Sequence, residues 1–98
     1  MIVPVQQIAS IVADGELLQI TTIQKERHTI TYRLKDLERR LDPSRFIRLG
    51  RGTLANVELI TKVSTMPGGT HVAKLTTGQK LQVSRLQSRT LRERFLKL

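Results

Sequence analysis

Apolar and polar residues alternate along the first third of the chain, with two interruptions. From Ile8 to Thr22 the alternation runs on both sides of Asp14-Gly15, a dipeptide typical of tight hairpin turns. The polar stretch Gln24–Arg27 indicates a second turn. A further alternating segment follows, with apolar positions at Ile30, Tyr32 and Leu34. The pattern predicts a three-stranded meander.

The apolar spacing then changes to that of a helix. Leu34, Leu37 and Leu41 recur every three or four residues, and Asp42-Pro43 ends the pattern. We expect a short helix within residues 33–44 that covers the sheet as a small lid. Its polar face is expected to be solvated and consists of Lys35, Asp36, Arg39 and Arg40.

Strand patterns return after this helix. Residues 45–49 read as extended, with Ile47 and Leu49 on one side and Phe46 and Arg48 on the other. The next strand is expected at residues 58–65, after a turn at 56–58, where we expect the Asn56 side chain to bond its own backbone.

The strongest turn signal in the chain is Met66–Gly69. Residues 71–83 then predict a hairpin around Thr77-Gly78, with Ala73 and Leu75 matched by Leu81 and Val83.

The end of the chain reads as a helix. Ser84 can cap it, and Gln87 three residues later completes a capping-box pattern. One apolar stripe contains Leu91, Phe95 and Leu98, and another face carries Arg85, Arg89 and Arg92. Like charges at these spacings repel one another, and a bound polyanion would relieve the repulsion. The alternative is a basic face that is simply solvated.

Composition places the chain among small globular domains. Residues 1–98 suffice for one domain with one thin core. There are no cysteines, so disulfides and thiolate metal sites are excluded and a reducing cytoplasm is expected. No apolar run approaches the roughly 18 residues that a membrane span requires, and the N-terminus does not resemble a secretion signal. We therefore expect a cytoplasmic protein with no membrane partner.

The charge is strongly one-sided. The formal net charge is +9, and from Leu59 to Leu98 eight basic residues face Glu93 alone. Such a field indicates a polyanionic partner, most often a nucleic acid and sometimes a membrane surface.

Catalytic and metal-binding patterns are missing. His28 and His71 lie in or beside predicted turns without a cysteine or second histidine near them, so we expect plain surface or turn residues and no metal site. The sequence has no phosphate-cradling loop motif, no nucleophile elbow and no evident carboxylate pair. We expect no enzyme activity and no cofactor.

Two arginines stand out between the predicted strands. Arg48 and Arg51 are three residues apart, and Gly50 and Gly52 flank the second. The strand would anchor the arginines, and the glycine-flanked turn would aim them at a phosphate or a narrow minor groove. The alternative for Arg48 is a structural ion pair with a carboxylate such as Glu58.

Three segments resemble the LytTR family of DNA-binding output domains of bacterial response regulators. The first, "IASIVADGELLQI", resembles the opening hairpin of the family. The second, "LERRLDPSRFIRLGRGTLANVELITKV", matches the spacing of Phe46, Arg48, Arg51, Asn56 and Ile60. The third, "LTTGQKLQVSR", matches at Gly78, Val83, Ser84 and Arg85. Gly50 and Gly52 depart from the family, which has histidine and serine there.

The resemblance implies a mainly β fold: an elongated arrangement of short antiparallel strands in small sheets, with a short mid-chain helix and a C-terminal helix. It also implies binding to double-stranded DNA, commonly at paired repeats, through loops that enter successive major grooves and the minor groove between them. It allows two further partners, a second protomer on DNA and a receiver or sensor domain outside this chain.

Carried over by position, the contact segments implied by the resemblance are Asp14–Leu17, Gly50–Thr53 and the stretch that begins at Ser84 and Arg85. The expected DNA-binding residues are Asp14, Gly15, Glu16, Arg48, Gly50, Arg51, Gly52, Ser84, Arg85 and Arg89. By chemistry, Arg85 can read guanine and Glu16 can read the cytosine amino group.

Two other functions remain open from the sequence. One is a small basic β-barrel that binds RNA, although Tyr32, Phe46 and Phe95 are few and scattered for stacking bases. The other is an interaction module for an acidic protein partner.

Overall fold

The computed structural model describes residues 3–95, without the side chains of residues 90, 92, 94 and 95. In chain order the elements are η1 (Val5–Gln7), β1 (Ile8–Asp14), β2 (Leu17–Thr22), β3 (Arg27–Thr31), α1 (Leu34–Arg40), β4 (Phe46–Gly50), β5 (Thr53–Asn56), η2 (Val57–Leu59), β6 (Ile60–Thr65), β7 (His71–Leu75), β8 (Lys80–Val83) and α2 (Arg85–Phe95).

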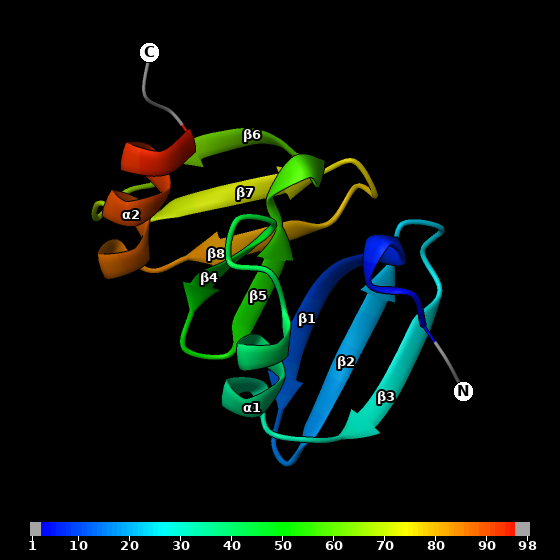
Figure 1. The fold of residues 1–98 in the computed structure, drawn as a ribbon. Coiled ribbons are helices and arrows are strands. Elements are labelled where there is room, and N and C mark those ends of the chain that lie inside the picture. Colours follow the sequence, from blue (N-terminus) through cyan, green and yellow to red (C-terminus); the bar gives the residue numbers. More distant parts are fainter. Residues whose placement is uncertain (1–2, 96–98) are drawn as a thin grey trace.

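The strands form two antiparallel sheets. The larger sheet has the order β3-β2-β1-β5-β4, and the smaller one has the order β6-β7-β8. The molecule is elongated, with principal extents of 39 × 24 × 21 Å, and neither sheet closes into a barrel (Figure 1). This confirms the expected fold class.

The β1–β2 hairpin has the predicted turn. Asp14 pairs with Leu17, so Gly15 and Glu16 are its two central residues. Gly15 takes a φ of 63°. Type II′ hairpin turns place glycine at this first central position, because other residues rarely adopt positive φ there.

The predicted three-stranded meander is present as β1, β2 and β3, but it is part of a larger sheet. Residues Thr53–Asn56 form β5, which pairs with both β4 and β1 and so joins two hairpins into one five-stranded sheet. The four-residue segment has no alternation, and Leu54 and Ala55 are both buried. A strand enclosed on both faces does not show the period-two pattern.

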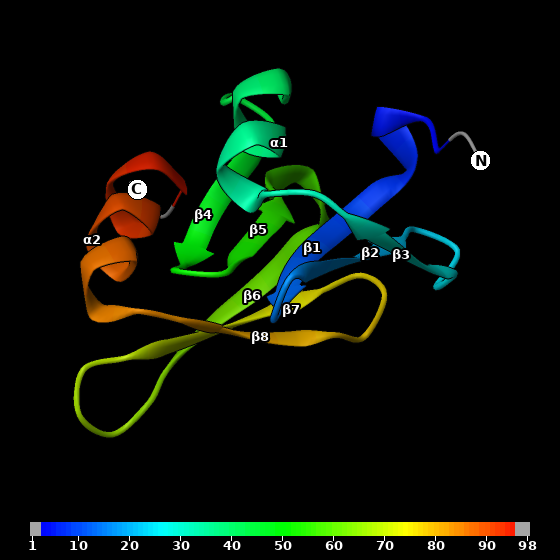
Figure 2. The same cartoon turned by 90° about the horizontal axis from the view of Figure 1, so that it is seen from below.

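The core is divided between the two faces of the larger sheet. On one face α1 covers the sheet, as the leucine spacing predicted, and the buried cluster consists of Ile8, Ile11, Leu18, Ile20, Leu34, Leu41, Phe46 and Leu54. On the other face the smaller sheet and α2 enclose Ala9, Ile47, Leu49, Ala55, Ala73, Leu75, Val83 and Leu91. Figure 2 shows the resulting layers, with α1 and the smaller sheet on opposite sides of β4 and β5.

Gln79, next to β8, fastens the two sheets together. Its Oε1 accepts a hydrogen bond from the Ser10 hydroxyl at 3.0 Å, and its Nε2 donates to Thr21 Oγ1 at 3.5 Å. Ser10 and Thr21 are buried, so each hydroxyl needs a partner. The β7–β8 turn is thereby held against β1 and β2.

Two local features fix the chain just before β4 and at the end of β5. The Asp42 carboxylate accepts bonds from the Ser44 hydroxyl and amide, which lower the pKa of Asp42. Asn56 Oδ1 accepts a bond from the Glu58 amide, as predicted, and its Nδ2 donates to the Ile8 carbonyl at 3.1 Å. The second bond ties the end of β5 to the start of β1.

Within residues 3–95, no helix is both long and apolar enough to cross a membrane. Of the apolar stripe predicted for the last helix, Leu91 is buried. The Phe95 side chain and Leu98 lie outside the described residues.

Candidate nucleic-acid interface

The three segments singled out from the sequence lie along one side of the molecule. The β1–β2 turn, the β4–β5 turn and the start of α2 follow one another there (Figure 1). The Ala13 amide donates to the Gly52 carbonyl at 2.7 Å, and the Ser84 amide donates to the Leu49 carbonyl at 2.8 Å. Backbone hydrogen bonds thus attach the end of β1 and the start of α2 to the β4–β5 hairpin.

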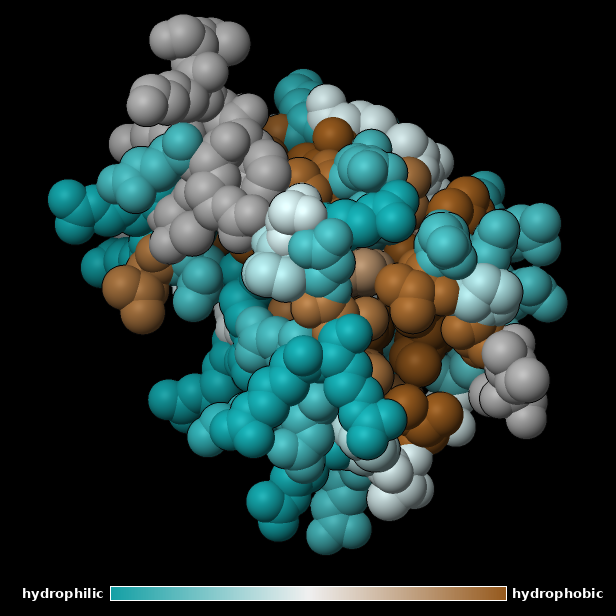
Figure 3. Space-filling model, viewed as in Figure 1, coloured by the Kyte–Doolittle hydropathy of each residue, from teal (hydrophilic) through white to brown (hydrophobic). Residues whose placement is uncertain are grey.

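A first hollow opens between the β1–β2 turn, the start of α1 and the β4–β5 turn. It measures about 720 Å³ and is lined by Ala13, Gly15, Glu16, Leu18, Thr31, Tyr32, Arg33, Leu34, Lys35, Arg48 and Arg51. Four of these residues are cationic and only Glu16 is anionic. In the space-filling view, polar side chains gather over α1 and the β1–β2 turn beside it (Figure 3).

A second hollow adjoins the first across the same two arginines. It measures about 550 Å³ and is lined by Glu38, Arg48, Gly50, Arg51, Ser84, Leu86 and Gln87. Because Arg48 and Arg51 line both hollows, the β4–β5 turn lies between the β1–β2 turn and α2. The three expected contact segments therefore form one continuous surface.

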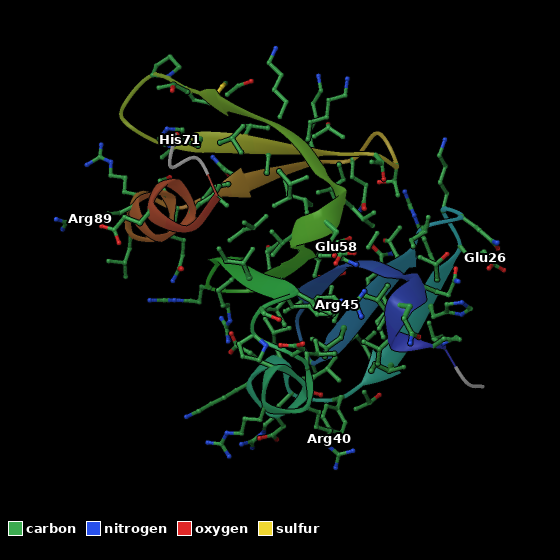
Figure 4. The ribbon with its side chains drawn as sticks, turned by 45° about the horizontal axis from the view of Figure 1, so that its top comes forward. Glu26, Arg40, Arg45, Glu58, His71 and Arg89 are labelled. Atoms are coloured by element: carbon green, nitrogen blue, oxygen red, sulfur yellow. The ribbon has the colours of Figure 1, made fainter. Side chains whose placement is uncertain are left out.

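Arg48 holds the β4–β5 turn in place. Its Nε lies 3.3 Å from Glu38 Oε1 of α1, and its Nη1 donates to the carbonyls of Gly50 and Arg51. The alternative expected from the sequence, a structural ion pair of Arg48 with a carboxylate, is confirmed with Glu38 as the partner. Glu58, the carboxylate named from the sequence, instead pairs with Arg45 at 3.5 Å (Figure 4). A half-buried Arg48 with these bonds has few donors left for a ligand.

Arg51, in contrast, is exposed and has no acidic partner within residues 3–95. It sits at the tip of the β4–β5 hairpin, where Gly50 pairs with Thr53. The sequence aimed both arginines at DNA, with an ion pair as the alternative for Arg48 alone. The structure separates Arg48, anchored by Glu38, from Arg51, which has no acidic partner among the described residues.

The two flanking glycines differ in what surrounds them. A Cβ built on Gly52 would lie 3.2 Å from the Ala13 Cβ, so a side chain there would push against the neighbouring hairpin, and glycine lets the two hairpins approach closely. A Cβ on Gly50 would meet nothing within 4 Å. Gly52 thus has a structural role, and Gly50 leaves open space on the candidate surface.

The start of α2 is capped by Ser84. Its Oγ accepts a bond from the Gln87 amide at 3.2 Å, as the capping pattern predicted. In a full capping box the Gln87 side chain would accept a bond from the Ser84 amide. Here the Ser84 amide donates to the Leu49 carbonyl instead. The cap therefore also joins α2 to β4.

His71 is buried in β7, so the expectation of a surface or turn residue was wrong. Its Nδ1 lies 2.9 Å from the Ser88 hydroxyl, which donates to the Ser84 carbonyl at 2.7 Å. Since that hydroxyl has a single hydrogen, the histidine Nδ1 must be the donor. His71 and Ser88 thus fix the first turn of α2, and sequence reasoning missed both.

Two arginines of α2 are exposed. The Arg85 guanidinium lies over the β6–β7 turn. Its Nη2 is 3.7 Å from the position that a Cβ on Gly68 would occupy, and its Nε is 3.9 Å from the corresponding position on Gly69. Arg89 extends outward and forms an exposed ion pair with Glu93 at 3.6 Å (Figure 4). This pair offsets part of the repulsion expected on the basic face; the Arg92 side chain lies outside the described residues.

The β1–β2 turn is exposed at Asp14, Gly15 and Glu16. Next to it, Arg33 and Lys35 line the first hollow, although the sequence assigned the polar face of α1 to solvent. No local signal could identify them, since only the fold brings the start of α1 beside the two hairpin turns.

The described residues offer neither a cluster of metal ligands nor an open aromatic platform. Across residues 3–95 no cluster of three histidine, cysteine, aspartate or glutamate side chains could hold a metal ion. Phe46 is buried, and Tyr32 is half-buried with Arg40 over its ring at 5.7 Å. Neither ring forms an open platform for nucleotide bases.

Known proteins resemble this chain in sequence pattern and in fold. The family model of the LytTr DNA-binding domain matches residues 1–96. The fold is similar to that of a solved LytTr DNA-binding domain, from a Bacillus cereus protein described as a methyl-accepting/DNA response regulator. The TM-score is 0.84 at 22% identity, over 93% of this chain and 83% of that one. Among curated proteins, none matches the chain significantly.

Proposed function

Since the chain belongs to the LytTr DNA-binding domain family, we propose that it recognises specific duplex DNA sequences as the output domain of a transcription regulator. The β1–β2 turn, the β4–β5 turn and the start of α2 form the DNA-binding surface. The observation that carries the proposal is the convergence of these segments on two adjoining hollows that share Arg48 and Arg51.

The middle of this surface binds the phosphate backbone and the minor groove. Arg51 projects from the hairpin tip without an acidic partner in the described part of the chain, so its guanidinium is free for a phosphate. Arg48 acts indirectly, by bonding the carbonyls of Gly50 and Arg51 and so holding the hairpin tip. Gly50 lets the backbone approach DNA closely, because its Cβ position is open.

The two outer segments enter successive major grooves. The molecule is 39 Å long, enough for a surface on one side of it to follow the roughly 34 Å of one duplex turn. At one end, Arg85 presents a guanidinium that can bond guanine O6 and N7. At the other end, Asp14, Gly15 and Glu16 approach base edges, where a carboxylate can accept a bond from cytosine N4. Ser84 and Arg89 contribute contacts near Arg85.

Two protomers on paired repeats extend this recognition. Each protomer supplies the same three segments, and a fixed spacing between repeats follows from the fixed geometry of each protomer. A receiver or sensor domain outside this chain would supply the regulatory input.

Selection from a random duplex library, at near-physiological salt, tests this function. We expect a repeated motif with fixed spacing to be recovered by the 98-residue chain. The same protein is titrated with single-stranded DNA and with RNA of matched length. Recovery of no motif, together with tighter binding to RNA than to duplex DNA, would refute the proposal.

A further inference from the structure

The outer face of the smaller sheet carries a row of three lysines. Lys62 pairs with Lys74 across β6 and β7, and Lys74 pairs with Lys80 across β7 and β8. All three side chains are exposed. We call them the lysine row. Adjacent strands lie about 4.8 Å apart, so three positive charges stand side by side on one face.

The lysine row is unfavourable in the isolated chain. Like charges directly opposite each other on paired strands are destabilising. No carboxylate within residues 3–95 lies within ion-pair distance of these amines, since the described pairs involve only arginines. An anionic group from outside the chain would relieve the repulsion.

Beside the lysine row the same face is partly apolar. Ser64, Val72 and Gln82 form the next row across the three strands. The lysines, Ser64, Val72 and Met66 line a hollow of about 320 Å³, and Met66 is 42% exposed. The opposite side chains of these strands, such as Ala73 and Val83, point into the core. The face thus combines a line of cations with an adjacent apolar contact.

The cation types separate this face from the DNA-binding surface. The DNA-binding surface is dominated by arginines, with Lys35 as the one lysine lining the two hollows, whereas the cations of this face are all lysines. Arginine offers the planar, bidentate geometry that suits phosphates and guanine, and lysine is a point charge without that geometry. A phosphate backbone would also gain nothing from Val72 and Met66.

We propose that the outer face of β6, β7 and β8 docks an acidic amphipathic helix of a partner protein. Side chains three or four residues apart on a helix are about 5–6 Å apart at Cβ, close to the strand spacing. A helix lying across the strands can therefore place one carboxylate against each lysine. An apolar side chain beside these carboxylates packs on Val72 and Met66.

Nuclear magnetic resonance titration of the isotope-labelled chain tests this docking surface. The probe is a synthetic amphipathic peptide of about four helical turns, with glutamates on one face and leucines beside them. The control peptide has glutamine in place of each glutamate. We expect saturable shifts at the amides of β6, β7 and β8 with the acidic peptide only, and the same shifts when the chain is bound to its selected duplex.

Matched variants assign the binding to the lysine row. Lys74→Glu reverses the central charge and is expected to weaken peptide binding about tenfold or more. Lys25→Glu makes the same change in the exposed β2–β3 turn and should leave peptide affinity nearly unchanged. Both substitutions make the net charge more negative by two, which by itself weakens binding to duplex DNA. Lys25→Glu measures this general effect, and Lys74→Glu should lower duplex affinity no further.

Three results would overturn the proposal. One is the absence of saturable shifts on this face. Another is peptide binding at the β4–β5 turn and α2 in competition with duplex. The third is a loss of duplex affinity in Lys74→Glu well beyond that in Lys25→Glu, which would make the lysine row a DNA backbone contact. The peptide titration uses the free chain, so the first of these results can be obtained whether or not a duplex motif is found.

Discussion

Arg48 Nε lies 3.3 Å from Glu38 Oε1, which joins the middle of β4 to α1 at the boundary between the two hollows. The same guanidinium bonds the carbonyls of the β4–β5 turn. Glu38 is therefore coupled through Arg48 to the backbone that carries Arg51. A carboxylate that would repel DNA on its own thus supports the surface that we propose binds DNA.

Glu38→Gln tests this coupling. We expect a stability loss of less than about 1 kcal/mol, because both partners are partly exposed. We also expect the affinity ratio between the selected duplex and random duplex to fall, since Arg48 no longer fixes the turn. The matched control is Glu58→Gln, which removes the same charge from the Arg45 pair. Equal ratios in both variants, measured by competition binding, would show that Glu38 has no positioning role.

Arg51→Ala is expected to weaken binding to all duplex sequences. The logarithm of affinity should also depend less steeply on the logarithm of salt, by about one unit per lost phosphate contact. Arg27→Ala removes an exposed arginine from β3, away from the hollows, and serves as the control. A salt slope that stays the same as that of the unsubstituted protein would leave Arg51 without a phosphate contact.

Arg85→Ala should relax the preference at one base position and cost about 1–3 kcal/mol of discrimination there. Repeating the duplex selection with this variant identifies the position directly. An equal loss of affinity for the selected and random duplexes would instead assign Arg85 to the phosphate backbone.

Gly52→Ala is expected to destabilise the fold by about 1 kcal/mol, because the added methyl group meets Ala13 at 3.2 Å. Gly50→Ala should have little effect on stability, since its Cβ position is open. Urea denaturation of the two variants side by side provides the comparison. If Gly50→Ala proves the more destabilising, the contact between the hairpins is not what selects glycine.

Ser88→Ala removes the hydroxyl between His71 and the Ser84 carbonyl. A loss of about 1–3 kcal/mol is expected, because the buried histidine Nδ1 is left without its partner. Base preference at the position read by Arg85 should also weaken, since the first turn of α2 is less fixed. Ser64→Ala, on the open face of β6, is the control for loss of a serine hydroxyl. A stable variant with unchanged preference would contradict a positioning role for Ser88.

Much of the fold could be predicted because its signals are local. The hairpin turn at Gly15, the leucine spacing of α1 and the Ser84 cap each depend on residues within a few positions of one another. The β5 strand escaped detection because it is enclosed on both faces and lacks alternation. Its position next to β1 depends on pairing between residues more than forty positions apart, such as Ser10 and Ala55.

The sequence by itself determined the strand periods, the turn and cap residues, the strong positive charge and the family pattern. Tertiary structure alone decided that Arg48 pairs with Glu38 rather than Glu58, and that Arg51 has no acidic partner within residues 3–95. It also decided that His71 is buried and that Arg33 and Lys35 join the two hairpin turns. Periods and caps follow from each residue's own backbone and nearest neighbours. The partner of a long side chain depends instead on which distant segments packing brings within reach.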